Sequence, residues 1–207
     1  MFLIFIKDLP KILKHSAGDI YADDTTISAN VDYRSAPGAL NQVLQADAGK
    51  AAQWTTGNKI VLNETKTKTM LVAGKHLRKK MSSTSLTVNI NSVELEQVQS
   101  HKLLGVIIDT QLNFLHIDNL CKKLTQHIAV LKKIRRHLPL DQRILYYNTM
   151  IKQTMMYGSS VWVSTSVDNL NKVFRLQRRA AQVILNADTR ANRVDLFREL
   201  NWLPFFS

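Results

Sequence analysis

Two adjacent aspartates, Asp23 and Asp24, are the residues of this chain whose type and spacing best suit chemistry. Tyr21 precedes them, and residues that favour strands occur on both sides, in 18–20 and 25–27. This pattern predicts a tight β-hairpin with the carboxylates at its tip. Because successive side chains of a strand point to opposite faces, the two aspartates can share a cation only at such a tip. Without a cation they would repel each other, and one would tend to keep its proton.

The same residues also fit an ordinary aspartate-rich turn. In such a turn the carboxylates accept hydrogen bonds from nearby backbone amides. The local sequence leaves both interpretations open, so the metal site depends on what the rest of the chain contains.

The segment Tyr21-Ala22-Asp23-Asp24 is similar to motif C, the Tyr-x-Asp-Asp signature of reverse transcriptases. Other segments resemble the same family in the expected order. They are 1–10 for the palm helix after motif B, 63–67 for motif D, 101–106 for the primer grip (motif E) and 116–124 for the start of the thumb. The resemblance is to non-LTR retrotransposon polymerases of the jockey type, and it continues to Trp202-Leu203-Pro204.

The resemblance implies an α+β fold in two parts. Residues 1–110 would form a partial polymerase palm, with a β-hairpin and a small antiparallel sheet with helices, and residues 111–207 an all-α, thumb-like helical bundle. In this family the motif A carboxylate, the Gly-Pro-Gln-Gly core of motif B and the fingers precede the segment that begins here at Met1. We therefore expect a reverse transcriptase fragment that is inactive alone and lacks its N-terminal palm and fingers.

The resemblance also assigns roles to individual residues. In the intact family enzyme, two Mg²⁺ ions about 4 Å apart support in-line displacement at phosphorus, and Mg²⁺ prefers carboxylate oxygens. Asp23 would be the principal metal ligand and Asp24 the accessory one, while Tyr21 would position the primer terminus. Lys66 would lend charge or a proton to the leaving pyrophosphate, although it also fits a plain surface lysine. The primer grip would comprise Lys102, Leu103, Leu104 and Gly105, which also fit a simple turn at the start of a strand.

Periodicity and turn residues predict the remaining elements. We expect an amphipathic helix over 36–54, a short strand over 59–62, an exposed basic loop over 75–85, a hairpin around Asn91-Ser92 and a continuous apolar strand from Leu103 to Ile108. Three helices should follow. They run from Ile117 to near Pro139, from Asp141 to Tyr157, and onward from Asp168 as N-cap.

The chain is strongly basic, with a net charge of +12 and a pI near 9.9, which favours a polyanionic partner. Residues 1–100 carry a net charge of +3 and residues 101–207 one of +9. On the predicted helices, the basic residues lie opposite the apolar stripes, where they can contact phosphates without distinguishing bases, or simply form a solvated face. They are Lys122, Lys133, Arg136, Lys172, Arg175 and Arg179.

The partners implied are an RNA template and a DNA primer, with dNTP in the intact enzyme. The single cysteine, Cys121, forms no internal disulfide, and its apolar neighbours favour a buried thiol. The sequence has no signal peptide or transmembrane segment, so we expect no membrane partner and an intracellular, nuclear or cytoplasmic, location. Two alternatives stay open. One is a non-catalytic nucleic-acid-binding module, and the other is a two-metal nuclease, which would need more carboxylates than Asp19, Asp23 and Asp24 supply.

Overall fold

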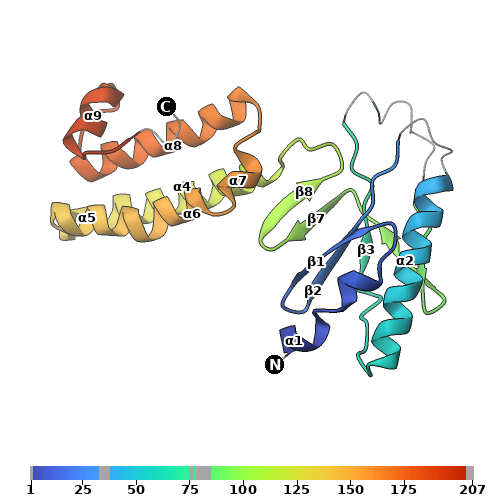
Figure 1. The fold of residues 1–207 in the computed structure, drawn as a ribbon. Coiled ribbons are helices and arrows are strands. Elements are labelled where there is room, and N and C mark those ends of the chain that lie inside the picture. The colour runs from blue at the N-terminus through green and yellow to red at the C-terminus, as the bar shows by residue number, and fades with distance from the viewer. Residues whose placement is uncertain (1, 33–37, 75–76, 78–84, 204–207) are drawn as a thin grey trace. The chain divides into compact units, whose positions relative to one another are not determined.

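The computed structural model describes residues 2–32, 38–74, 77 and 85–203. The chain divides into two units (Figure 1). The mixed unit comprises Met1–His101 and Asp109–Leu112, and the helical unit comprises Lys102–Ile108 and Asn113–Ser207. Most of the predicted basic loop at 75–85 lies outside the described residues.

The first part of the mixed unit is a hairpin that leads to a long helix. A short helix α1 (Phe2–Ile6) and a 3-10 turn (Leu9–Ile12) precede the antiparallel strands β1 (Ala17–Tyr21) and β2 (Asp24–Ser28). The hairpin prediction is therefore confirmed. Helix α2 (Gly38–Gly57) covers residues 38–54 of the predicted amphipathic helix and continues three residues beyond it, while residues 36 and 37 lie outside the described residues.

The second part of the mixed unit consists of short strands, namely β3 (Lys68–Thr69), β4 (Asn89–Ile90), β5 (Val93–Glu94) and β6 (Glu96–Gln97). Strands β4 and β5 form the hairpin predicted around Asn91-Ser92, where both turn residues have positive φ, at 49° and 66°. That conformation matches the twist of a two-residue hairpin. Strands β3 and β6 pair in parallel.

The predicted strand at 59–62 is wrong. Helix α2 ends in a chain reversal that uses these residues, with Lys59 at φ 58° and the Ile60 amide donating to the Thr55 carbonyl. Val61 is 93% exposed. The short apolar run therefore forms the end of the helix instead of a strand. Such a helix end depends on local backbone geometry, which the alternation of apolar residues does not predict.

A small apolar core joins α2 to the segment that contains β4. Ala48 and Ala52 pack against the buried side chains of Val88, Ile90 and Leu95. Along 86–90 the even-numbered residues are buried and the odd-numbered ones exposed, as expected for a strand with one covered face.

Side-chain amides of α2 also bond to the backbone of this segment. Asn41 donates to the Ser85 carbonyl and accepts from the Thr87 amide, at 3.2 Å each. One helical turn later, Gln45 donates to the Asn89 carbonyl at 2.9 Å and accepts from the Asn89 amide at 2.7 Å. Two amides on one helix thus bond to alternate residues along one side of an extended segment.

Strands β7 (Ser100–Leu103) and β8 (Val106–Asp109) form a further two-stranded sheet. The predicted continuous strand from Leu103 to Ile108 is therefore wrong. Leu104 and Gly105 both have positive φ, at 46° and 84°, and make a two-residue turn in the middle of the apolar run. The sequence signal was the single glycine, which we interpreted as part of a strand.

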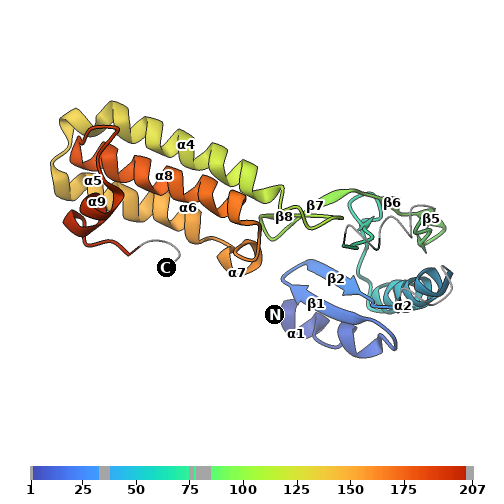
Figure 2. The same cartoon turned by 90° about the horizontal axis from the view of Figure 1, so that it is seen from above.

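The helical unit contains three long helical segments that lie side by side (Figure 2). The second is continuous through a π-helical stretch, and the described residues of the unit also form two short helices. The elements are α4 (His116–Ile134), a 3-10 turn (Arg135–His137), α5 (Leu140–Tyr146), the π-helical stretch (Tyr147–Lys152), α6 (Gln153–Met156), α7 (Ser159–Trp162), α8 (Val167–Leu185) and α9 (Arg193–Glu199).

The predicted N-cap of the third long helix is wrong by two residues. Ser166 caps α8, and its hydroxyl accepts from the Asn169 amide at 3.4 Å. Asp168 lies in the first turn instead, where its negative charge complements the helix dipole. Both residues suit a helix start, so composition alone did not separate them.

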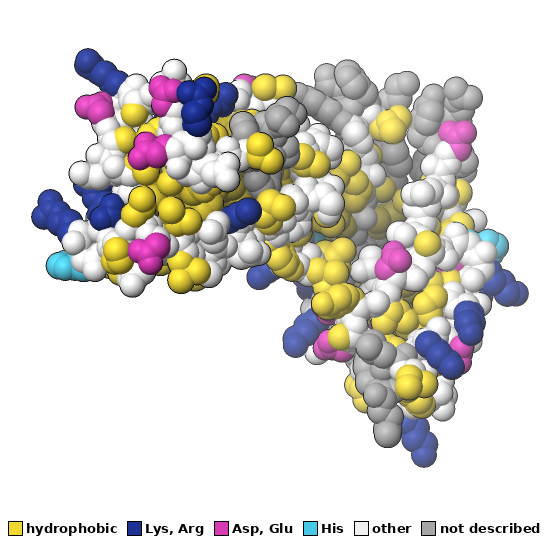
Figure 3. Space-filling view, turned by 60° about the vertical axis from the view of Figure 1, so that its left-hand side comes forward, with side chains coloured by type: hydrophobic (Ala, Val, Ile, Leu, Met, Phe, Trp, Pro, Cys, Tyr) yellow, Lys and Arg dark blue, Asp and Glu magenta, His cyan; other side chains and the backbone are white. Residues whose placement is uncertain are grey.

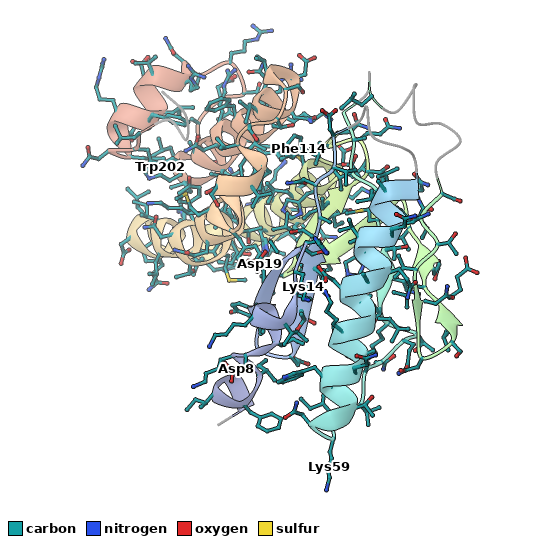
Figure 4. The ribbon with its side chains drawn as sticks, turned by 45° about the vertical axis from the view of Figure 1, so that its right-hand side comes forward. Asp8, Lys14, Asp19, Lys59, Phe114 and Trp202 are labelled. Atoms are coloured by element: carbon teal, nitrogen blue, oxygen red, sulfur yellow. The ribbon has the colours of Figure 1, made fainter. Side chains whose placement is uncertain are left out.

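A large apolar core holds the helical unit together. The stripe predicted on α4 is confirmed, with Ile117, Leu124 and Leu131 fully buried. At the C-terminal end, Trp202 stacks on buried Tyr147 with ring centroids 3.8 Å apart (Trp202 is labelled in Figure 4). The structure is thus mixed α and β, in agreement with the expected fold class. Across the described parts of the chain, no helix has the length and apolar character that crossing a membrane requires.

Candidate active site

The four residues 21–24 lie at the tip of the β1–β2 hairpin. Tyr21 and Asp24 are the last cross-strand pair, and Ala22 and Asp23 form the two-residue turn between them. Ala22 takes the positive φ, at 54°. All four residues are exposed, and Tyr21 retains 66% of its accessible surface. The carboxylates are therefore open to solvent at a defined turn.

The hairpin register decides which side chains share a face. Tyr21 and Asp24 are directly opposite each other, and Asp19 is two residues before Tyr21 on β1. Directly opposite residues of an antiparallel pair project on the same face, as do residues two apart in a strand. Tyr21, Asp24 and Asp19 therefore share a face, while Asp23 extends from the turn itself.

The donor chemistry at this tip suits a hard divalent cation. Asp23 and Asp24 are adjacent, exposed carboxylates, and carboxylate oxygen is a preferred ligand of Mg²⁺. Two such groups fill only part of a magnesium coordination shell, which commonly includes water and substrate phosphate. Within the ranges that the structure describes, no group of three or more His, Cys, Asp or Glu side chains is placed to hold a metal ion.

A buried aspartate on α2 holds the segment that leads into β1. The Asp47 side chain is 0% exposed and accepts hydrogen bonds from the backbone amides of Lys14 (3.1 Å), His15 (2.8 Å) and Ser16 (2.9 Å). It also forms an ion pair with Lys50. Burial alone would raise the pKa of Asp47, but the Lys50 hydrogen bond and these amides outweigh it and hold the pKa far below 3.8.

Asp47 therefore fixes the start of the aspartate hairpin to α2 through directional contacts. Figure 4 labels Lys14, which belongs to the held segment, and Asp19, which lies on the strand that follows. Asp47 was not among the residues predicted from the sequence to have a role. The available signal was its position within the apolar stripe of the helix, three residues after Leu44 and four before Ala51.

Lys66 lies in a separate turn of the mixed unit. Its amide donates to the carbonyl of Asn63 and to the side-chain oxygen of the same residue, at 3.2 and 3.0 Å. Its side chain is exposed. Among the described residues, no hydrogen bond or ion pair links Lys66 to Asp23 or Asp24. The proposed pyrophosphate role stays a prediction.

The predicted primer-grip residues belong to the helical unit. Lys102 is exposed on β7, Leu103 is partly buried, and Leu104 and Gly105 form the turn to β8. The Tyr157 hydroxyl donates to the Leu104 carbonyl. A two-residue turn that includes the glycine thus replaces the continuous strand predicted here, and it lies in the unit that does not carry the aspartates.

The six basic residues predicted to contact nucleic acid are all exposed on or beside α4 and α8. On the face of the helical unit in Figure 3, lysine and arginine side chains project around an area where hydrophobic side chains gather. Lys172 forms an ion pair with Asp118 at 2.9 Å, and this hydrogen bond and charge raise the pKa of Lys172. Arg178 was not among the predicted basic residues; it donates to the carbonyls of Thr189 and Ala191 and so has a structural role.

Comparison with known proteins gives two distant relatives that cover nearly the whole chain. One is "Probable RNA-directed DNA polymerase from transposon X-element" of Drosophila melanogaster, 21% identical over 216 residues, which cover 100% of this chain. Another is "Probable RNA-directed DNA polymerase from transposon BS" of the same organism, 23% identical over 214 residues, which cover 97% of this chain. The chain spans 23% of the length of each relative. No family model and no solved structure matches.

These two relatives support the retrotransposon reverse transcriptases as the family to which this chain is related. The class was expected from motif C and the motifs that follow it.

Proposed function

We propose that this chain is the C-terminal part of the polymerase region of a non-LTR, jockey-type retrotransposon reverse transcriptase. The mixed unit would be the end of the palm and the helical unit a thumb. The similarity of the whole chain to 23% of two transposon RNA-directed DNA polymerases supports this proposal. The order of the motif-like segments along the sequence supports it independently of overall identity.

The observation that carries the proposal is the exposed tip of the β1–β2 hairpin. It presents Asp23 and Asp24 with Tyr21 at the end of the same ladder. In this proposal Asp23 and Asp24 hold Mg²⁺, which when bound lowers the barrier for attack of a primer 3′-hydroxyl on the α-phosphate of a dNTP. Tyr21 orients the primer terminus, and further carboxylate ligands come from a segment outside this chain.

The direct test uses a fusion in which the fingers and upstream palm of a retrotransposon polymerase precede this chain. We expect Asp23→Asn to abolish template-dependent dNTP incorporation by the fusion, because one neutral oxygen cannot replace a charged ligand. Asp8→Asn is the matched control, since Asp8 is an exposed aspartate of the same unit outside the hairpin. The 207-residue chain alone should incorporate no dNTP. Full activity of the Asp23→Asn fusion would contradict the catalytic assignment.

A second candidate function is a nucleic-acid-binding module that no longer catalyses. The observation that favours it is the exposure of Lys122, Lys133 and Arg136 on one helical segment and Arg175 and Arg179 on another. Such surfaces bind phosphates by displacing counterions, so affinity falls steeply with salt. We expect the isolated chain to bind RNA–DNA hybrid with little sequence preference and to lose affinity between 50 and 200 mM salt, ~10³-fold if six or more phosphates are contacted.

Charge reversal separates a specific surface from general attraction. Reversal of Lys122, Lys133 and Arg136 should weaken hybrid binding more than reversal of Lys75, Lys79 and Lys80, which lie outside the described residues. Equal losses would show that net charge alone, rather than the helical surface, drives binding. Binding together with an inactive fusion would favour the module over the polymerase fragment.

A further inference from the structure

The turn between β7 and β8 packs against the end of α6 through two glycines. A Cβ added to Gly105 would lie 3.1 Å from the Tyr157 ring and hydroxyl. A Cβ added to Gly158 would lie 2.6 Å from a methyl of Val106, closer than side chains approach each other. Each segment therefore places a glycine where the other presents a side chain, and all four residues belong to the helical unit.

The backbone conformation is a second reason, besides the close contacts, why residues with a Cβ are disfavoured at these two positions. Gly105 has φ +84° and Gly158 has φ +61°, a region that disfavours residues with a Cβ. Leu104 adopts φ 46° beside Gly105. A leucine in this left-handed conformation costs free energy, which surrounding contacts must offset.

Hydrogen bonds connect the turn to the fully buried core of the bundle. The Tyr157 hydroxyl donates to the Leu104 carbonyl, and the Tyr157 carbonyl accepts from the indole nitrogen of Trp162 at 3.1 Å. Trp162 is 0% exposed. On the other side, the Ile107 amide donates to Nδ1 of His116 at 3.4 Å, at the start of α4. The turn is therefore held from two helices.

The Tyr157–Leu104 hydrogen bond lies near the surface, since Tyr157 is 56% and Leu104 40% exposed. Exposed hydrogen bonds exchange readily with water and contribute little net stability. Removing this hydroxyl should therefore change the position of the turn far more than the stability of the unit. A role in positioning can be separated from a role in folding at this residue.

We propose that Tyr157 is a positioning residue for primer binding, which fixes the Leu104–Gly105 turn to the helical bundle so that the turn and the bundle contact the primer strand as one body. This inference rests on the proposed function, because it takes the turn as the segment that approaches the primer. The group recognised is the sugar–phosphate backbone near the 3′ end of a DNA primer. Gly105 and Gly158 permit the close approach, and Tyr157 sets its geometry.

Tyr157→Phe tests the inference, with Tyr146→Phe as the matched control. The Tyr146 hydroxyl also donates to a backbone carbonyl of the helical unit, that of His127 at 3.4 Å, but far from the turn in sequence. In the 207-residue chain, Tyr157→Phe should speed amide hydrogen exchange at Gly105 and Val106 about 3-fold, while Tyr146→Phe leaves these amides unchanged. Both variants should keep the melting temperature of the native chain.

Activity is measured in the fusion with upstream palm and fingers. Tyr157→Phe should raise the KM for a recessed RNA–DNA primer–template about 5-fold with a smaller change in kcat, and Tyr146→Phe should change neither. Unchanged exchange at the turn, or equal KM values for the two variants while Asp23→Asn is inactive, would overturn the inference alone. An Asp23→Asn fusion that still extends primers would instead overturn the proposed function, and the primer role of Tyr157 with it.

Discussion

The two units are stabilised by different kinds of interaction. The helical unit has a broad apolar core, in which Trp162, Leu124 and Ile151 are 0% exposed. The mixed unit has a smaller core, in which two alanines of α2 pack against Val88, Ile90 and Leu95, and its fully buried Asp47 bonds to the backbone of a neighbouring segment. One unit is held mainly by burial of apolar surface and the other relies more on directional hydrogen bonds.

The two kinds of interaction differ in how precisely they can fix the position of a side chain. Apolar burial is non-directional, so packed helices adjust to small shifts at modest cost. Hydrogen bonds from three successive amides to one carboxylate fix both distance and angle. In the proposed function, the aspartate hairpin would benefit from the second kind of support, because displacements near 1 Å can cost ~100-fold in rate.

The strongest test of this contrast is Asp47→Ala. The change leaves three backbone amides and Lys50 without their buried acceptor, and we expect it to lower the free energy of unfolding of the mixed unit by ~4 kcal/mol. Amide hydrogen exchange, which reports on each unit separately, measures the loss. Glu94→Ala, an exposed carboxylate of the same unit, should change it by less than ~0.5 kcal/mol. If Asp47→Ala lowered the free energy of unfolding no more than the control does, Asp47 would not anchor the segment.

Leu124→Ala tests the opposite unit. Leu124 is fully buried in the helical core, so its truncation should cost that unit ~3 kcal/mol through lost burial and a residual cavity. Exchange of the hairpin amides in the mixed unit should stay unchanged. Leu145→Ala, at a leucine that is 61% exposed, is the control and should have little effect. Loss of protection in both units would show that they unfold together.

Acid should weaken the two units in different pH ranges. Backbone and Lys50 hydrogen bonds outweigh burial and hold the pKa of Asp47 below 3.8, so its stabilisation is present above that value and is lost as pH falls below it. Burial, and then the charge of Lys123, lower the pKa of His116 from 6.5, so its neutral form stabilises the helical unit and protonation removes that contribution below 6.5.

Amide hydrogen exchange measured as a function of pH checks these pH ranges. It is compared between the native chain and the variants Asp47→Asn and His116→Gln. Each variant should weaken the pH dependence of its own unit in the range assigned to that residue and leave the other unit's pH dependence unchanged. A helical unit whose stability increases on acidification from pH 7 would contradict the direction assigned to His116.

The smallest expected effects are at the helix caps, where the helical unit also uses directional contacts. The Asn192 side chain accepts from the Val194 amide at 2.9 Å, and Asn192→Ala should cost ~1 kcal/mol. Ser166→Ala should cost less, because the Ser166 contact is longer, at 3.4 Å. Thermal unfolding of the two variants ranks them. The reverse order would show that cap distance does not determine the loss.

Periodic patterns in the sequence predicted the elements that have one apolar face. The stripe of α4 and the alternation of 86–90 follow directly from residues that repeat every three to four or every two positions. The aspartate hairpin was predicted because its tip and its flanks differ in composition. In each case a local pattern and the tertiary structure favour the same conformation.

The features that the sequence did not reveal depend on contacts between distant residues. Asp47 is 31 residues from Ser16, and Tyr157 is 53 residues from Leu104. No periodicity links such partners. The turn at Leu104-Gly105 and the helix end at Lys59 depend on one or two positive-φ residues, and the apolar residues around them gave no indication of a turn. Helix α9 was not predicted, because its seven residues are too short for a clear periodic pattern.

The side-chain amides of Asn41 and Gln45 affect whether chains can associate with each other at high concentration. By bonding to Ser85, Thr87 and Asn89, they occupy the side of an extended segment that another polypeptide would otherwise use to add a strand. Side chains of helix α2 thereby form the hydrogen bonds that the backbone of a neighbouring strand would otherwise form. We therefore expect two polar residues one helical turn apart to disfavour self-assembly through this edge.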